Sequence, residues 1–219
     1  MPGPRQPKIY HIVHVDRLKS ISQDSCLWCD TEIIKRSSPG TSIGMSGIKR
    51  RRLYELSLTS YPDLHVGDFV PFYFCPRSVM LYLINQGNHP DLDYRGGQVP
   101  ILHLQSDLYA AVQWAEQNKR RWAFTLSNAG SFYFEDRCSL AHLGDIDWDA
   151  VRANQWGGPG VSLSVKEGKQ AEFLMEYRFP WCLVEKIGVI SHKIHDQVSK
   201  ILGSCEHIPR IQVKPNWYY

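Results

Sequence analysis

A run of alternating side chains late in the chain offers the clearest candidate for chemistry. From residue 172 to residue 179, a set that is mostly aromatic alternates with a set that is mostly charged, and Pro180 ends the run; the first set is Phe173, Met175, Tyr177 and Phe179, and the second is Glu172, Leu174, Glu176 and Arg178. A period of two with many aromatic residues predicts a strand. Glu172 opens this strand directly after a long polar, Gly-rich segment. A carboxylate where a loop meets a sheet edge can act on a ligand, whereas a solvated surface glutamate is the alternative.

Three further groups have side chains that could act together with such a carboxylate. His11 lies in an expected strand, where it is either a packed core residue or a fixed hydrogen-bond donor. The basic run 49–52 is either a solvated helix face or a contact for phosphate groups. Tyr73, in an aromatic-rich stretch, either packs in the core or stacks on a ring of a ligand. These residue types alone leave the alternatives open.

The cysteine pattern is a weaker signal. Cys26 and Cys29 have the C-x-x-C spacing of a zinc or redox half-site. A structural zinc site needs about four ligands, and no second close pair follows, so we expect no metal. No G-x-G-x-x-G or Walker spacing occurs either, which argues against a Rossmann or P-loop nucleotide site.

Length and composition are those of an ordinary globular protein. The 219 residues, 43% of them hydrophobic, suffice for one domain with a large core. A net charge of +3 permits an anionic partner without requiring one. No stretch approaches the roughly 18 apolar residues of a membrane span, and the N-terminus lacks an apolar signal core. We therefore expect a cytoplasmic protein, without a membrane partner, whose six cysteines are reduced.

The elements that must position the candidates follow from local patterns. Helices are expected at 48–58, 79–85, 106–118, 148–153 and 195–202, and strands at 8–13, 68–75, 99–105, 122–126, 172–179, 187–191 and 210–214. Pro71 predicts that its strand is an edge strand or carries a bulge. Because this order lacks simple βαβ alternation, it predicts a single mixed α+β domain. The long segments 22–47 and 127–170 are expected to be largely irregular, and such loops tend to be functional.

Several local motifs are more specific than these patterns. They are Ile9-Tyr10-His11-Ile12, residues 42–52, Val70-Pro71-Phe72-Tyr73-Phe74-Cys75-Pro76-Arg77-Ser78, residues 96–104, residues 169–174 and Trp217-Tyr218-Tyr219. The order of a His, an aromatic element and a late Glu resembles the ADP-ribosyltransferase superfamily. The motifs themselves resemble the DarT family, bacterial toxins that ADP-ribosylate bases in single-stranded DNA. The resemblance runs from residue 8 to the C-terminus and is weakest over 22–41 and 106–168.

The resemblance implies an ADP-ribosyltransferase-like mixed β-sheet with short helices, using NAD as co-substrate and no metal. Glu172 then matches the catalytic glutamate of the family and Arg52 its catalytic arginine. The residues expected to bind NAD are His11, Ile12, Val13, Tyr73 and Arg77, and for Arg77 a DNA contact is the alternative.

The resemblance also implies roles for two segments of the chain and a partner protein. Residues 22–58 are expected to fold over NAD, and residues 127–170 to read the target base. Family members are opposed by DarG, an antitoxin whose macrodomain removes the modification. Family members modify either thymidine or guanosine. The Arg52 motif and the aromatic motif of this sequence are more similar to those of the members that modify thymidine.

Residue type predicts where DNA is held. The candidate phosphate contacts are Arg50, Arg51, Lys119, Arg120 and Arg121. Trp156, or an aromatic residue within 132–134, is expected to stack on a base. Two alternatives stay open: a transferase that acts on guanosine, RNA or protein, and a non-enzymatic nucleic-acid-binding module. Glu172 favours an enzyme, because binding DNA does not require a carboxylate.

Overall fold

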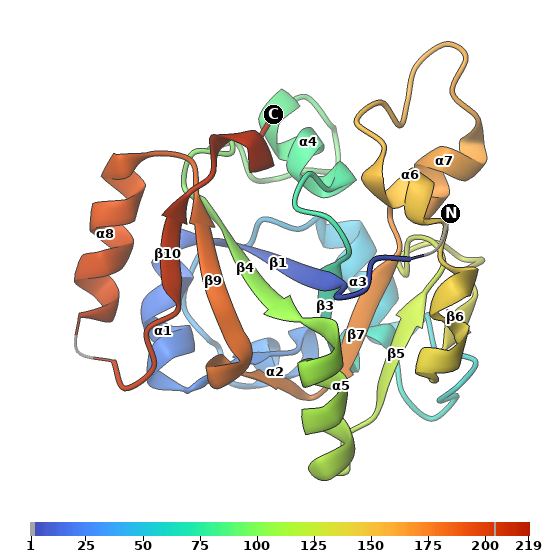
Figure 1. Ribbon diagram of the computed structural model, residues 1–219, viewed down its shortest axis with the longest axis horizontal. Helices are drawn as coiled ribbons and strands as arrows, with labels where there is room; N and C mark the ends of the chain where they lie inside the picture. The colour runs from blue at the N-terminus through green and yellow to red at the C-terminus, as the bar shows by residue number, and fades with distance from the viewer. Residues whose placement is uncertain (1–2, 204) are drawn as a thin grey trace.

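A mixed β-sheet forms the centre of the computed structural model, which describes residues 3–203 and 205–219. Its strands are β1 (Lys8–His14), β3 (Phe69–Tyr73), β4 (Ile101–Asp107), β5 (Trp122–Thr125), β6 (Asp136–Arg137), β7 (Glu172–Glu176), β9 (Val184–Val189) and β10 (Arg210–Val213). They lie in the order β10-β9-β4-β1-β3-β7-β5-β6 (Figure 1). The pair β9–β10 is parallel, and the neighbours from β9 to β6 pair antiparallel. A small second sheet pairs β2 (Cys26–Trp28) with β8 (Arg178–Pro180).

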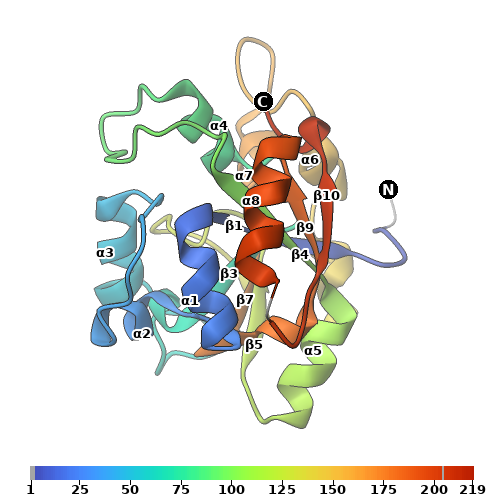
Figure 2. The same cartoon turned by 90° about the vertical axis from the view of Figure 1, so that its left-hand side faces the viewer.

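Short helices surround the sheet. They are α1 (Leu18–Gln23), α2 (Asp30–Lys35), α3 (Ser46–Tyr54), α4 (Val79–Gln86), α5 (Leu108–Gln117), α6 (Trp148–Arg152), α7 (Leu163–Gly168) and α8 (His192–Leu202). Side chains of Ser78, Asp107 and Ser191 accept a backbone N–H at the first turns of α4, α5 and α8, which is how such residues start helices. Figure 2 shows α1, α2 and α3 grouped on one side of the molecule. Within the described residues, no helix is long and apolar enough to cross a membrane.

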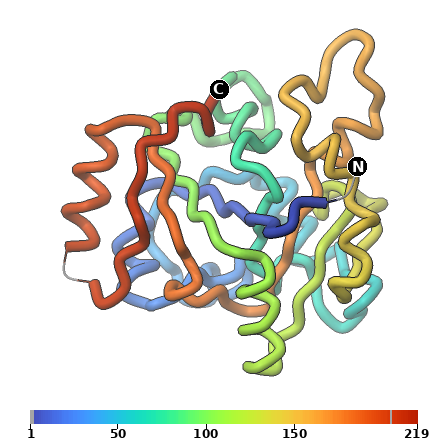
Figure 3. Tube along the Cα trace, viewed as in Figure 1, coloured from blue at the N-terminus to red at the C-terminus, as the bar shows by residue number. Residues whose placement is uncertain are grey.

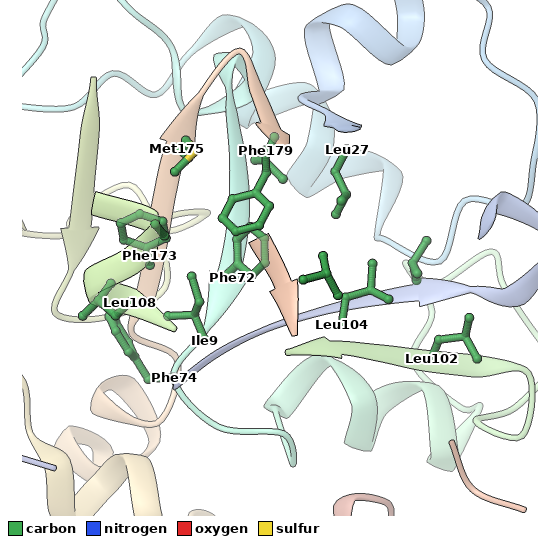
Figure 4. Close-up of a cluster of buried hydrophobic side chains, with 14 of the residues drawn as sticks. Ile9, Leu27, Phe72, Phe74, Leu102, Leu104, Leu108, Phe173, Met175 and Phe179 are labelled. Carbon is green, nitrogen blue, oxygen red and sulfur yellow. The ribbon is translucent and has the colours of Figure 1, made fainter. Parts of the chain in front are cut away.

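Aromatic rings fill the core between the sheet and the covering segments. Phe72 of β3 lies 4.4 Å from Phe179 and 6.3 Å from Phe173, measured between ring centroids (Figure 4). These rings are fully buried, and each contributes on the order of 2–3 kcal/mol by leaving water. The other face of β7 is also buried, because Leu174 packs in a second cluster with Val66 and Phe69. A strand buried on both faces holds its first residue, Glu172, firmly.

The α+β class and the single mixed-sheet domain are confirmed, and one strand prediction was wrong. Pro71 does not lie on an edge, because β3 runs between β1 and β7. On the β1 side the backbone register pairs only Tyr10 with Tyr73, and the His11 ring bonds the Pro71 carbonyl oxygen. A missing N–H therefore costs little at that place. The predicted strand 172–179 is divided at Tyr177, which has a positive φ of 69°, into β7 and β8. The short strands β2 and β6 had no clear pattern and were not predicted.

Candidate active site

Six of the predicted site residues line one cavity. We call it the central cavity; β1 provides His11, Ile12 and Val13, α3 provides Arg52, β3 provides Tyr73 and β7 provides Glu172. Residues from 17 to 49 form its outer wall, and Val79, Met80 and Leu83 of α4 form another side. Part of the segment predicted to fold over NAD is thus the part that covers this cavity.

An ion pair between Arg52 and Glu172 lies in the wall of the central cavity. Nη1 of Arg52 donates to Oε2 of Glu172 at 3.0 Å and to Oε1 at 3.3 Å. Glu172 is 2% exposed and Arg52 9%, so the pair is screened from solvent and the idea of a solvated surface glutamate is wrong. The backbone N–H of Ala129 also donates to Oε1, at 3.3 Å. The carboxylate is therefore held from two directions.

Arg52 keeps its charge and has donor capacity left. Burial alone would lower the pKa of Arg52, but the carboxylates of Glu172 and Asp30 outweigh it and hold the pKa above its ordinary value. Nη2 of Arg52 is buried and makes no hydrogen bond within the part of the chain that the structure describes. A buried N–H without a partner is costly unless something bonds to it, so Nη2 is suited to meet a ligand.

His11 and Tyr73 are both neutral groups at neutral pH. Burial lowers the pKa of His11, and its Nδ1 lies 2.8 Å from the carbonyl oxygen of Pro71. Nδ1 must then carry the proton of the neutral ring, which leaves Nε2 as an acceptor. Burial, and secondly the nearby charge of Glu172, raises the pKa of Tyr73. Its hydroxyl therefore stays protonated and can donate to a ligand.

Two cavity residues, Asn128 and Gln170, were missed from the sequence. Nδ2 of Asn128 donates to Oε1 of Gln170 at 3.1 Å, while Oδ1 of Asn128 accepts the backbone N–H of Gly130 at 2.7 Å. These bonds shape the turn that presents the Ala129 N–H to Glu172. Asn-Ala-Gly is a turn signal, but nothing in it indicates which strand the turn faces.

The remaining predicted residues lie outside the central cavity. Arg77 and Trp156 line a second cleft on the other side of α4. Arg51 donates to the carbonyl oxygen of Gly130 at 3.1 Å and sits over the Phe132 ring at 5.0 Å. Arg50 is exposed, 3.8 Å from Glu55. None of these positions assigns a function by itself.

The basic run 119–121 follows the end of α5, which points away from α3 (Figure 2). Arg120 lies over the Tyr177 ring at 4.9 Å, and Arg121 pairs with Asp63 at 2.6 Å. Lys119 is exposed. The predicted contact between this run and DNA stays a prediction.

The C-x-x-C pair consists of two buried free thiols. Burial raises the pKa of Cys26 and of Cys29 to about 11, so both are protonated at neutral pH. Among the described residues, no group of three or more His, Cys, Asp or Glu side chains is arranged to hold a metal ion.

Comparison with known proteins agrees with this geometry. The model of the family described as "ssDNA thymidine ADP-ribosyltransferase, DarT" matches residues 10–219. The DNA ADP-ribosyl transferase of Thermus sp. (strain 2.9) is 36% identical, and the match covers 99% of this chain and 98% of that protein. The chain belongs to the DarT family. This confirms the predicted family and makes the chain an NAD-dependent DNA ADP-ribosyltransferase.

Solved DarT structures share the whole fold. Thermus sp. 2.9 DarT in complex with ADP-ribosylated single-stranded DNA is 35% identical, with a TM-score of 0.87, and the match covers 100% of this chain and 99% of that one. The same Thermus protein in complex with NAD+ is 34% identical, with a TM-score of 0.80, and the match covers both chains fully. The predicted ADP-ribosyltransferase-like fold and NAD as co-substrate are thereby confirmed. The roles of individual residues stay predictions.

Proposed function

We propose that this chain transfers ADP-ribose from NAD+ to thymidine in single-stranded DNA and that Glu172 and Arg52 are its catalytic residues. The observation that supports these roles best is the buried Arg52–Glu172 pair in the wall of the central cavity, where Nη2 of the guanidinium has no hydrogen-bond partner among the described residues. A purely structural ion pair would have no need of a ligand cavity beside it.

Glu172 acts on the ribose of NAD+. The transfer breaks the bond between nicotinamide and the ribose carbon, and nicotinamide leaves with the electron pair. Positive charge develops on the ribose, and a fixed carboxylate in a water-poor cavity stabilises it strongly. Because the Ala129 N–H and Arg52 already orient the carboxylate, little reorganisation is needed during the reaction.

Arg52 acts on the acceptor base. The ring nitrogen of thymine that is free of deoxyribose carries a proton, which must leave as the new bond to ribose forms. Arg52 cannot accept it, because the neighbouring carboxylates hold its pKa above an ordinary value that is already far above neutral pH. Instead, Nη2 donates to the oxygen on which negative charge develops, and Glu172 or water takes the proton. The product is an N-glycosidic bond between base and ADP-ribose.

The outer wall of the central cavity is proposed to close over NAD+. The carboxylate of Asp16 accepts the Thr41 hydroxyl at 2.6 Å and the Thr41 N–H at 3.1 Å. Arg17 donates to the carbonyl oxygens of Thr41 and Gly40 at 2.9 and 2.8 Å. These bonds fasten the loop around residue 40 to the turn that follows β1, and Arg17 and Thr41 line the same cavity as His11. We expect His11, Ile12, Val13 and Tyr73 to contact the nicotinamide end of the co-substrate.

Single-stranded DNA is proposed to approach along the turn next to Glu172. Phe132 and Tyr133 are exposed there, Tyr133 to 94%, and Arg51 lies over the Phe132 ring. Exposed rings beside arginines match the stacking and phosphate contacts of single-strand binding. Within this proposal, residues 127–170 read the base, and Arg50, Lys119, Arg120, Arg121 and Trp156 add further contacts.

The decisive experiment uses oligonucleotides that contain one thymidine. Purified protein is incubated with NAD+ and the oligonucleotide, and mass spectrometry measures a gain of one ADP-ribose. We expect the gain with the thymidine oligonucleotide, its loss when thymidine is replaced by cytidine, and its loss in Glu172→Gln, which keeps the shape of the side chain. A gain on guanosine, RNA or a protein acceptor instead of thymidine would reject the proposed acceptor.

A macrodomain antitoxin of the DarG type is the proposed partner, and the cytoplasm, where DNA is replicated, the proposed location. Such a partner removes ADP-ribose from the base, with water as the expected acceptor, so it must abolish the mass gain of the purified modified oligonucleotide. Expression of the active chain is expected to stop bacterial growth, and co-expression with the macrodomain to restore it. Growth arrest by Glu172→Gln as well would mean that the toxicity has another cause.

A further inference from the structure

The second cleft lies against the central cavity but shares none of its lining residues. Arg77, Tyr82, Trp156, Lys166 and Tyr219 line it, together with backbone of the loop that ends at α7. Figure 3 shows this loop, residues 154–162, rising beside α4 at the top of the molecule. The cleft encloses about 660 Å³, which is within the range of roughly 300–1,000 Å³ typical of sites for small ligands.

The rings of the second cleft hold one another in place. Tyr82 meets Trp156 and Tyr219 edge to face, at 5.1 and 5.2 Å between centroids. Nε1 of Trp156 donates to the Tyr219 hydroxyl at 3.1 Å, and that hydroxyl donates to the carbonyl oxygen of Arg77 at 3.0 Å. Such a fixed aromatic wall loses little entropy when a flat ligand stacks on it.

Cations complete the second cleft. The Arg77 guanidinium lies 4.3 Å from the centroid of the Tyr219 ring, and its Nε is buried without a hydrogen-bond partner within the described residues. Lys166 adds a second positive charge, and none of the lining side chains is acidic. Aromatic rings with two cations and no carboxylate fit a group that is flat at one end and anionic at the other. That is the chemistry of a nucleotide.

Two elements join the second cleft to the central cavity. On α4, Tyr82 faces the cleft, whereas Met80 and Leu83 face the cavity. At the end of α7, Lys166 lines the cleft and Gln170 lines the cavity, and Nε2 of Gln170 donates to the Lys166 carbonyl oxygen at 3.0 Å. About one helical turn therefore separates the two sites, a step that adjoining nucleotides of one strand can span.

We propose that the second cleft binds a nucleotide flanking the target thymidine on the same DNA strand, with its base against Trp156 and its phosphate near Arg77 and Lys166. The proposal rests on the proposed function, namely single-stranded DNA as acceptor. The second cleft then recognises the DNA next to the target base and takes no part in the transfer reaction itself. A strand bound at both sites is held across α4, so that the target base is positioned over Glu172.

The test is an abasic scan with the full-length protein. Oligonucleotides with one thymidine receive a single abasic site at each flanking position in turn, and kcat/KM is measured for wild type and Trp156→Ala. At one position, wild type is expected to lose about 5- to 150-fold, the value of one stacked base. On the intact strand, kcat/KM of Trp156→Ala is expected to be lower than that of wild type by a similar factor. An abasic site at that position is expected to lower kcat/KM of Trp156→Ala no further. If the two losses multiply at every position, or if Trp156→Ala equals wild type on the intact strand, the proposal is wrong.

A charge variant tests the cleft independently of folding. Lys166 is exposed, and Lys166→Ala is expected to reduce the slope of log affinity against log salt by about 0.7 for a single strand. Lys193→Ala, on α8, is the matched control and is expected to leave the slope unchanged. Equal slopes in the two variants would overturn the phosphate contact. Failure of the proposed function itself is distinct, because wild type would then modify no DNA at all.

Discussion

Two short basic runs look alike in the sequence but occupy different environments. In the run 49–52, on α3, Arg52 is buried and paired with Glu172, while Arg50 on the same helix is exposed. In the run 119–121, after α5, the charges stay at the surface, where Arg121 meets Asp63. Each run could have been interpreted as a nucleic-acid contact, yet only the first contributes a side chain to the central cavity.

Helix geometry and position explain the difference. Successive residues of a helix point about 100° apart, so a run of three arginines on α3 presents only one of them to a given neighbour. The neighbour of Arg52 is the first residue of β7, a strand buried on both faces. The run 119–121 instead follows a helix C-terminus, where cations are favoured by the helix dipole. A buried ion pair is seldom better for stability than apolar residues, so stability alone does not account for the Arg52–Glu172 pair, and this supports the catalytic role that we propose for it.

The largest effects are expected from substitutions in the buried Arg52–Glu172 pair. We expect Glu172→Gln to lower kcat by about 10³-fold or more, and Arg52→Lys by about 10²- to 10³-fold, because each removes a fixed charge or donor from the transition state. Arg52→Lys keeps the charge and removes the fork of the guanidinium. Oligonucleotide mass spectrometry under single-turnover conditions measures both. An Arg52→Lys protein with the full rate would remove Arg52 from the mechanism.

The same pair gives a stability prediction. Arg52→Met leaves the Glu172 carboxylate buried beside the Ala129 N–H without its cation, and it is expected to lower the free energy of unfolding by about 3 kcal/mol. The double variant Arg52→Met with Glu172→Leu removes both charges and is expected to recover most of that loss. Urea unfolding of the single variants and the double variant measures it. If the double variant is less stable than Arg52→Met, the pair is a structural element after all.

Lys169 is a third kind of cation, buried with no ion pair to a carboxylate among the residues that the structure describes. It is 4% exposed, and Nζ donates to the carbonyl oxygens of Val151 and Ala153 at 2.7 and 2.9 Å. Lys169 thereby ties the end of α6 to the segment that leads into Glu172. We expect Lys169→Met to cost about 2 kcal/mol of stability, from two charge-assisted hydrogen bonds. We also expect it to raise KM for DNA about tenfold while KM for NAD+ stays constant.

The comparison of KM values decides what Lys169 does. If Lys169 positions the loop after α6, its substitution changes only KM for DNA, because that loop lines the second cleft and not the central cavity. Equal losses in both KM values, in proportion to the loss of folded protein, would indicate that Lys169 only stabilises the fold.

The residues of the two sites differ in how well their positions could be predicted from the sequence. Glu172 opens a stretch with a period of two, and His11 and Tyr73 lie in stretches rich in β-branched and aromatic residues, so the presence of all three in strands was predictable. That they meet in one cavity followed from resemblance to a family, because strand order depends on contacts between distant segments. Asn128 and Gln170 were missed, since neither residue lies in a periodic element. Arg77 and Trp156 are adjacent only through the packing of α4 against a loop about 80 positions later, which no local pattern reports.

The smallest expected effect comes from the second basic run. If Lys119 and Arg120 contact DNA, as we predict, they do so at the surface, where salt screens each charge. Lys119→Ala and Arg120→Ala should then raise KM two- to threefold, roughly the value of one exposed contact, and only with oligonucleotides long enough to reach the end of α5. The slope of log affinity against log salt should fall by about 0.7 per charge, and kcat should not change.

Lys200→Ala on α8 controls for net charge, and a salt slope equal to that of this control would show that the run 119–121 has no part in binding DNA. Arg121 is unsuitable for this test, because its side chain is paired with Asp63 and its removal would change that ion pair as well.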